Sequence, residues 1–285
     1  MKNREIKINF GTISALCWGE GNKKKILALH GWLDNAASFS HLAPLLAKEG
    51  YEVIAIDFAG HGHSDHRAKG HYCHFIDFVL DVQAVLKELK WQKPTLLGHS
   101  MGAAMAQMYA TTCPEKIENL IMIENLGPVP AYVAGSAASN LKEALNQWEK
   151  HTLEHKNFYP TIKEALKARL KVTPMQEHFL LPMVERGLKK TAKGYHWRTD
   201  KRLRLRSLTR FTEDFVQDVL SSKKPKTQLI LAEPQTYALS YDSKLERIKA
   251  LKAQEFLQVE GHHHLHMDKA EILAKAILKF IKNRA

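Results

Sequence analysis

Cysteine is scarce in this sequence of 285 residues, which contains only Cys17, Cys73 and Cys113. An odd number of widely spaced cysteines argues against a disulfide scaffold and favours reduced thiols in the cytoplasm. Long apolar runs are also lacking: residues 1–15 contain no apolar signal-peptide segment, and no stretch is long enough to span a membrane. We therefore expect a cytoplasmic protein without stable membrane insertion.

Acidic residues are fewer than basic ones, because 30 Asp and Glu stand against 42 Lys and Arg, which gives a formal net charge of +12. Such an excess is compatible with nucleic acid, a membrane surface or a phosphorylated substrate as partner. However, the sequence has no RNA-binding signature and no stripe of interleaved basic and aromatic residues. Short lysine runs, such as 23–25, are typical of a solvated surface. We expect a small-molecule substrate and no nucleic acid, and the sequence carries no signal for an oligomeric state.

Short apolar runs alternate with helical patterns in the first part of the chain. The runs at 26–29, 53–56 and 120–123 indicate strands that are buried on both faces of a sheet. Between the last two runs, apolar residues recur at helical spacing over 75–90. This alternation indicates βαβ units and therefore an α/β fold with a mostly parallel sheet.

The pattern of buried strands stops near residue 128 and resumes near residue 223. The segment between them is helix-prone, basic and aromatic. We therefore predict an α/β core made of 1–127 and 223–285, with 128–222 as a helical cap over the strand ends. The aromatic and leucine side chains of the cap suggest a substrate with an apolar acyl or alkyl group, although packing of the cap onto the core would also explain them.

The chain is organised around Gly98-His99-Ser100-Met101-Gly102, which follows a strand pattern and leads into a helical one. A strand, Gly-x-Ser-x-Gly and a helix together form the context of a nucleophile elbow. A serine on so tight a turn needs neighbours with almost no side chain, and Gly98 and Gly102 supply them. The N-terminus of the helix directs backbone N–H groups toward a developing oxyanion. Ser100 is therefore the candidate nucleophile.

Three further motifs surround this elbow in a fixed order. Together the four resemble the α/β-hydrolase superfamily: His30-Gly31-Trp32, Asp57-x-x-Gly60-x-Gly62-x-Ser64, Gly98-His99-Ser100-Met101-Gly102 and Gly261-x-His263. The stretches 30–39 and 194–206 resemble more particularly the serine-hydrolase-like proteins, a branch with a helical cap. The resemblance implies the α/β-hydrolase fold, with helices on both sides of a mostly parallel central sheet and a helical cap insertion. It also implies a serine hydrolase with a Ser-His-acid triad.

The loop before the final helix should supply the general base, and four histidines crowd there. His263 is the candidate, because it lies five residues before Asp268, where many relatives carry an acidic residue after the catalytic histidine. His262 and His264 remain competitors. A metal site is another interpretation of this cluster, together with His266, but no cysteine and no tight group of acids nearby completes a ligand set.

The acid that orients the histidine commonly follows a later strand, but the expected aspartate position is Gln235 here. A glutamine cannot stabilise an imidazolium as a carboxylate does. Some branches, such as the haloalkane dehalogenases, carry a Glu directly after the strand that follows the nucleophile helix. Glu124 occupies that place and is the candidate acid, with Glu233 and Asp242 as alternatives. A structural ion pair between Glu124 and a cap arginine such as Arg204 is the non-catalytic explanation.

The predicted oxyanion hole uses the backbone N–H groups of Trp32 and Met101, and such a donor typically supplies about 3 kcal/mol of transition-state stabilisation. In the predicted reaction Ser100 attacks an ester carbonyl, His263 transfers the serine proton to the leaving group, and water hydrolyses the acyl-enzyme. This chemistry needs no cofactor. Thioester hydrolysis, C–C bond hydrolysis, cofactor-free haloperoxidase activity and a ligand-binding relative with little turnover remain alternatives.

Other polar residues are interpreted as structural. His30 is expected to support the oxyanion loop through hydrogen bonds, and Asp57 to hold the loop that contains Gly60 and Gly62. A second group of histidines fits a solvated loop better than a metal cluster: His61, His63, His66, His71 and His74.

Overall fold

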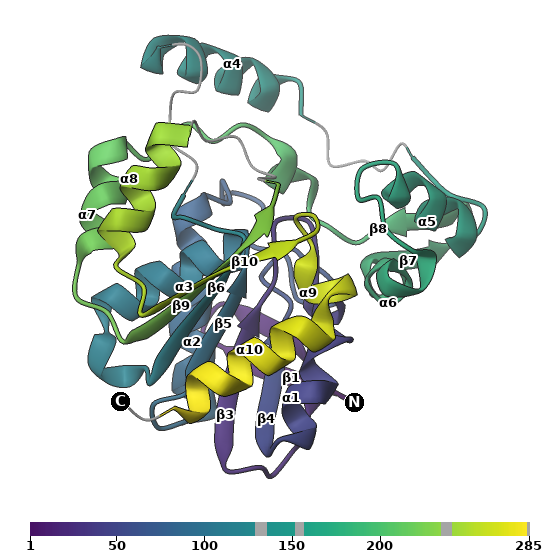
Figure 1. The fold of residues 1–285 in the computed structure, drawn as a ribbon. Helices are drawn as coiled ribbons and strands as arrows, with labels where there is room; N and C mark the ends of the chain where they lie inside the picture. Colours follow the sequence, from purple (N-terminus) through teal and green to yellow (C-terminus); the bar gives the residue numbers. More distant parts are fainter. Residues whose placement is uncertain (129–135, 152–156, 235–240, 284–285) are drawn as a thin grey trace.

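The computed structural model describes residues 1–128, 136–151, 157–234 and 241–283, and its centre is an eight-stranded sheet (Figure 1). The strands are β1 (Lys2–Ile8), β2 (Gly11–Trp18), β3 (Lys24–Leu29), β4 (Tyr51–Ile56), β5 (Thr95–His99), β6 (Asn119–Ile123), β9 (Lys226–Glu233) and β10 (Glu255–Glu260). Their order in space is β1-β2-β4-β3-β5-β6-β9-β10. The pairs β1–β2 and β2–β4 are antiparallel, and all later pairs in this order are parallel. The prediction of a mostly parallel sheet is confirmed.

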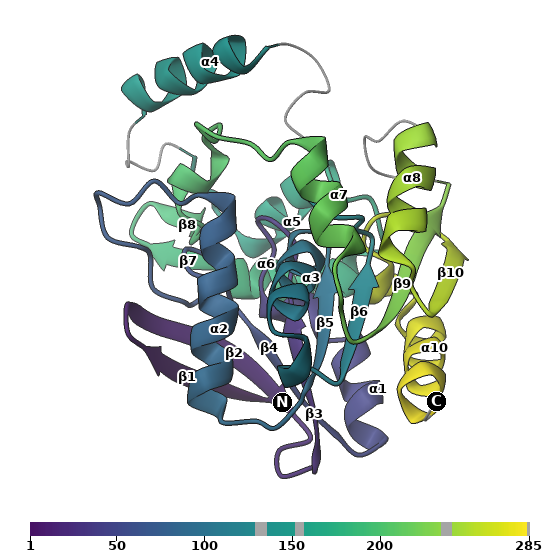
Figure 2. The ribbon, with the colours of Figure 1, turned by 90° about the vertical axis from the view of Figure 1, so that its left-hand side faces the viewer.

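Helices cover both faces of this sheet (Figures 1 and 2). One face carries α1 (Leu42–Lys48) and α10 (Ala270–Lys282), and the other carries α2 (Phe78–Leu89), α3 (Met101–Thr112), α7 (Glu213–Ser221) and α8 (Tyr241–Leu251). The short helices are η1 (Ala36–Phe39), η2 (Phe75–Asp77), η3 (Pro114–Lys116) and α9 (Leu265–Asp268). Along β3, Ile26 and Ala28 pack on the face that carries α1 and α10, whereas Leu27 and Leu29 pack on the opposite face. Burial on both faces explains the continuous apolar runs of the parallel strands.

The chain leaves the sheet after β6 and returns to it at β9, and the segment between these two strands is called the insertion below. Its elements are α4 (Ala137–Glu149), α5 (Ile162–Leu170), α6 (Glu177–Gly187), β7 (Leu188–Thr191), β8 (Gly194–Trp197), η4 (Lys201–Arg204) and α7. In both views α4 lies beyond the carboxyl ends of the parallel strands (Figures 1 and 2). At the end of the insertion α7 returns to the core, where its Val216 and Leu220 are buried beside α3.

The insertion contains a short hairpin where the sequence indicated helices alone. In β7 and β8, Leu188 pairs with Trp197 and Thr191 with Gly194. The hairpin escapes a search for buried strands because each strand has four residues and Lys189 and Lys190 are exposed. Among the described residues, no helix combines the length and the apolar character that crossing a bilayer requires.

Candidate active site

Ser100 occupies a strained turn between β5 and α3. Its backbone has φ of 50° and ψ of −118°, a combination that L-residues rarely adopt outside functional sites. The turn leaves no room for side chains two positions away: a Cβ on Gly98 would collide with the backbone of Ala103, and one on Gly102 with the carbonyl of Leu29. The Ser100 N–H donates to the Ile123 carbonyl at 2.9 Å, which fixes the turn to the end of β6. The local geometry is that of a nucleophile elbow.

His263 lies between the other two candidate residues of the triad. Its Nε2 is 2.9 Å from the Ser100 Oγ, and its Nδ1 is 3.0 Å from Glu124 Oε2. The three side chains follow the carboxyl ends of β5, β6 and β10, which run parallel within one sheet. Since a carboxylate only accepts, Nδ1 of a neutral His263 carries the proton and Nε2 can accept the proton of the Ser100 hydroxyl.

Glu124 is held in place by backbone contacts to the neighbouring strand. It is 2% exposed and adopts a positive φ of 54°. Its N–H donates to the Ile230 carbonyl at 2.8 Å, and its Oε1 accepts the N–H of Ala232. Arg204 makes no ion pair within the described part of the chain, so the cap ion pair considered from sequence is not formed. The carboxylate is instead directed at His263 by β9.

The alternative acids lie elsewhere on the surface. Glu233 is exposed, and its Oε2 accepts from the Gln258 amide at 2.6 Å. Asp242 is exposed in the first turn of α8. Gln235, at the position where an aspartate is expected in many relatives, lies outside the described residues.

The competing histidines of the same loop point to other carboxylates. His262 Nε2 is 2.9 Å from Asp268 Oδ2, and His264 Nε2 is 3.3 Å from Asp34 Oδ2. Among the three histidines considered from sequence, it is His263 that the structure brings within hydrogen-bond distance of Ser100.

Two backbone N–H groups are available beside Ser100 for an oxyanion. Met101 is the first residue of α3, where N–H groups have no acceptor within the helix. Trp32 lies in the loop after β3, and like Met101 and Ser100 it lines the same cavity. In the described structure neither N–H has a protein acceptor. His30 supports this loop from beneath, because its Nδ1 donates to the Gly31 carbonyl at 2.7 Å while its Nε2 accepts the Phe58 N–H at 3.0 Å.

A cavity of about 590 Å³ opens above Ser100. Its walls are mainly aromatic and aliphatic, and they come from both the core and the insertion: Trp32, Tyr72, Phe75, Phe78, Trp148, Leu203, Leu205, Leu208 and Phe211. The charged residues that line it are basic, namely Arg204, Arg206 and Arg210. The cavity therefore suits an apolar group and repels a cationic one.

The second group of histidines does not converge on a common point. His61 is fully buried, and burial together with His30 lowers its pKa to about 3, so its ring is neutral. His66 contacts the Arg198 carbonyl at 2.9 Å, and His74 lines the cavity. Asp57 is structural: its carboxylate binds Arg186 at 2.8 Å and accepts the N–H of Ala36 at 2.7 Å.

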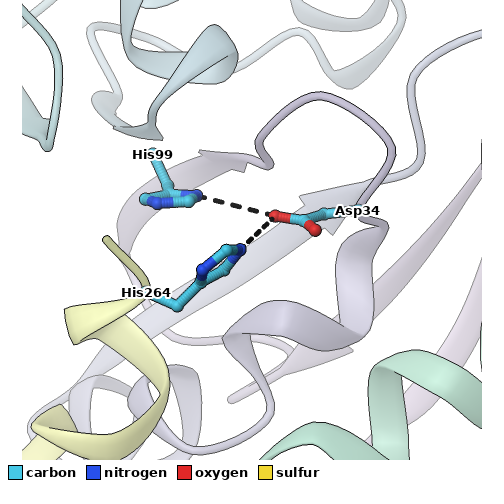
Figure 3. A group of neighbouring side chains, drawn as sticks. All are labelled: Asp34, His99 and His264. Atoms are coloured by element: carbon cyan, nitrogen blue, oxygen red, sulfur yellow. Dashed lines mark ion pairs between the residues drawn. The ribbon is translucent and has the colours of Figure 1, made fainter. Parts of the chain in front are cut away.

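A different set of side chains comes close enough to share a metal ion. Within the described residues these are Asp34, His99 and His264, whose potential ligand atoms lie within 4.8 Å of one another (Figure 3). Sequence analysis missed this set because its carboxylate belongs to the loop after β3, far along the chain from the histidine-rich loop.

Known proteins resemble this chain over nearly its whole length. Residues 25–161 match the model of the family described as the α/β hydrolase fold. The serine hydrolase-like protein of Danio rerio is 32% identical over 288 residues, which make up 97% of this chain and 87% of the relative. A hypothetical protein from Pseudomonas aeruginosa PAO1, known from a crystal structure, is 36% identical in sequence. The two structures superpose with a TM-score of 0.91, and the match covers 99% of this chain and 100% of the other. A thioesterase domain from the curacin biosynthetic pathway is 26% identical, with a TM-score of 0.85, and the match covers 98% of this chain and 99% of that domain.

Proposed function

Because the chain belongs to the α/β-hydrolase superfamily, among the serine hydrolase-like proteins, we propose that it cleaves esters through Ser100, His263 and Glu124. One observation carries this proposal. A single imidazole lies 2.9 Å from the serine hydroxyl and 3.0 Å from a buried carboxylate, on a serine held in an elbow. A base between a nucleophile and an orienting acid is the arrangement that activates a serine.

In the proposed reaction the Ser100 Oγ attacks the ester carbonyl while His263 Nε2 removes its proton. The negative charge moves to the carbonyl oxygen, which accepts hydrogen bonds from the N–H groups of Trp32 and Met101. Collapse of the tetrahedral intermediate breaks the bond to the leaving oxygen, which takes the proton from His263. Water then repeats these steps on the acyl-enzyme and releases the acid. Glu124 holds the His263 tautomer and stabilises the imidazolium.

The proposed substrate carries an apolar acyl or alkyl group that fills the cavity above Ser100. Aromatic walls support this choice, since burial of apolar surface contributes roughly 25 cal/mol per Å². The insertion would act as a cap, because Trp148 of α4 and Leu205 contribute to the same cavity. The cap is proposed to set which acyl chains bind, while the core performs the chemistry.

Thioester hydrolysis is the second candidate, and the thioesterase domain with 26% identity favours it. The same triad would serve both reactions, because they share the acyl-enzyme and differ in the leaving atom. Oxygen and sulfur esters of one acyl chain, compared by kcat/KM, separate the two. A preference for the sulfur ester of tenfold or more would assign the enzyme to thioesters.

The proposal is tested by rapid mixing with a p-nitrophenyl ester. We expect a burst of p-nitrophenol close to one equivalent per chain if deacylation is slower than acylation, and steady turnover in either case. Ser100→Ala should abolish both signals while the protein remains folded by circular dichroism. Turnover that survives in Ser100→Ala would refute the proposed nucleophile.

A further inference from the structure

Behind the triad, three side chains from separate parts of the chain point toward one another (Figure 3). Asp34 Oδ2 is 3.3 Å from His264 Nε2 and 3.7 Å from His99 Nδ1. Asp34 and His99 are buried, whereas the His264 side chain is 12% exposed. The cluster is therefore closed on the core side and reaches solvent through His264.

The hydrogen bond of His99 leaves its other nitrogen facing the carboxylate. His99 Nε2 is 2.7 Å from the His263 carbonyl, and since a carbonyl only accepts, this nitrogen carries the ring proton. Nδ1 of the neutral ring then presents a lone pair toward Asp34, and in the described structure it has no hydrogen-bond partner. Two electron-rich atoms, His99 Nδ1 and Asp34 Oδ2, thus face each other at 3.7 Å in a buried site, and a cation between them would stabilise this arrangement.

Each of the two groups therefore has an unprotonated atom to offer. His99 presents the lone pair of Nδ1, because its Nε2 donates to the His263 carbonyl, and Asp34 presents Oδ2. Metal ions bind imidazoles and carboxylates through such unprotonated atoms.

We propose that Asp34, His99 and His264 form a binding site for a divalent transition-metal ion of the Zn²⁺ type. Zn–N and Zn–O bonds of about 2.0–2.1 Å in a tetrahedron place neighbouring ligand atoms about 3.3–3.4 Å apart. The separations of 3.3 and 3.7 Å match this spacing with small movements of the rings. Two nitrogens and one oxygen favour Zn²⁺ or its neighbours over Mg²⁺ and Ca²⁺, which prefer oxygen ligands.

The surroundings of the site support and limit this binding. Arg169 Nη2 contacts Asp34 Oδ1 at 2.7 Å, which orients the carboxylate and leaves Oδ2 for the ion. The same guanidinium repels a cation, so we expect moderate affinity. His99 is fixed by its bond to the His263 carbonyl and by the ring of His266, whose centroid is 4.0 Å away.

An ion at this site would connect the two halves of the active centre. His99 directly precedes Ser100, and His264 directly follows His263. Binding should therefore stabilise the loop that holds the base, and raise the melting temperature through preferential binding to the folded state.

The test is calorimetric titration of chelator-stripped full-length protein with Zn²⁺, together with the visible absorption of bound Co²⁺. We expect one equivalent of bound metal, a Co²⁺ spectrum of a four-coordinate site, and a higher melting temperature. His264→Gln should weaken Zn²⁺ binding at least about tenfold, because losing a metal ligand lowers the affinity more than losing a residue that only hydrogen-bonds to a ligand. His264 is chosen because its side chain reaches the surface, whereas Asp34→Asn risks the fold.

Two variants serve as controls. His262→Gln removes a ring of the same loop that faces Asp268 instead, and should retain the Zn²⁺ affinity. His263→Ala removes the triad imidazole but keeps the carbonyl that His99 contacts, and should also retain it. Equal Zn²⁺ affinity in His264→Gln and in wild type would overturn the proposal. Loss of Zn²⁺ affinity in His263→Ala but not in His264→Gln would also overturn it, because it would place the metal on the triad. Absence of binding to wild type would show that protons alone hold the cluster.

Discussion

The sheet edge and the insertion differ in how firmly their functional side chains are held. At the sheet edge, Ser100 and Glu124 are fixed by backbone hydrogen bonds to adjacent strands, and both have positive φ. In the insertion, the residues above the cavity come from α4 and the segment around η4, and Leu141 and Leu145 of α4 are 43% and 55% exposed. From this comparison we propose that the core carries the chemistry, which needs precise geometry, and that the insertion sets the selectivity.

Ser100→Ala tests the role of the core and should have the largest effect. Removal of the nucleophile should lower kcat by about a millionfold, because the remaining groups of the triad act only as a unit with it. The melting temperature should stay close to that of wild type, since Ser100 Oγ contacts solvent-accessible space and His263. Ester hydrolysis and a thermal melt measure the two quantities. A kcat within a factor of ten of wild type would mean that the chemistry lies elsewhere.

Glu124→Gln tests whether the buried carboxylate acts through His263. We expect kcat to fall by about 10⁴, because an amide can stabilise neither the imidazolium nor the required tautomer. Steady-state kinetics with one activated ester measures this loss. The matched control is Glu233→Gln, which changes an exposed carboxylate that accepts from Gln258 and should leave kcat unchanged. A large loss of kcat in Glu233→Gln and none in Glu124→Gln would identify Glu233, at the end of β9, as the acid of the triad.

Arg186→Met tests how the insertion is attached to the core. Arg186 of α6 binds the buried Asp57 at 2.8 Å, so its removal leaves an uncompensated carboxylate in the core. The free energy of unfolding should fall by about 3–5 kcal/mol. Urea denaturation measures this loss. Arg206→Met removes a half-exposed ion pair with Glu143 and should lower the free energy of unfolding by about 0–1 kcal/mol. Similar losses in both variants would contradict the distinction between the buried and the exposed ion pair.

Trp148→Ala tests selectivity with the smallest expected effect. Trp148 of α4 lines the cavity, and its ring meets that of Tyr72 edge to face, with 5.1 Å between the ring centroids. Loss of this wall should reduce kcat/KM for long acyl chains by about 10–200-fold, which corresponds to about 1–3 kcal/mol. For an acetyl ester kcat/KM should remain unchanged. Competition between acetyl and octanoyl esters measures the ratio, and an equal loss for both would assign Trp148 a purely structural role.

Sequence reasoning succeeded where local patterns dictate structure. Apolar runs identified the buried strands, and the two glycines around Ser100 identified the elbow, because no other residue fits so close to the backbone of Ala103 and Leu29. Glu124 was chosen by its resemblance to branches that carry a Glu directly after the strand that follows the nucleophile helix. The structure brings Ser100, His263 and Glu124 within hydrogen-bond distance, and their catalytic roles remain predictions.

Sequence reasoning left alternatives open where tertiary contacts decide. The spacing to Asp268 favoured His263 but kept His262 and His264 as competitors, because their partners Asp268, Glu124 and Asp34 are selected by the fold. The approach of Asp34 to His99 joins residues that are far apart in the sequence, and no spacing rule reveals it. The hairpin of β7 and β8 lacks an apolar run because each strand has four residues and β7 exposes Lys189 and Lys190.

The triad is tested most directly by mass spectrometry after reaction with a fluorophosphonate probe. We expect a single adduct, located on Ser100 by peptide mapping, that is absent in Ser100→Ala. Labelling should be slower by orders of magnitude in His263→Ala and Glu124→Gln, and unchanged in His262→Gln and Glu233→Gln. Labelling of Glu124→Gln at the wild-type rate, or an adduct on another residue, would contradict the triad of Ser100, His263 and Glu124.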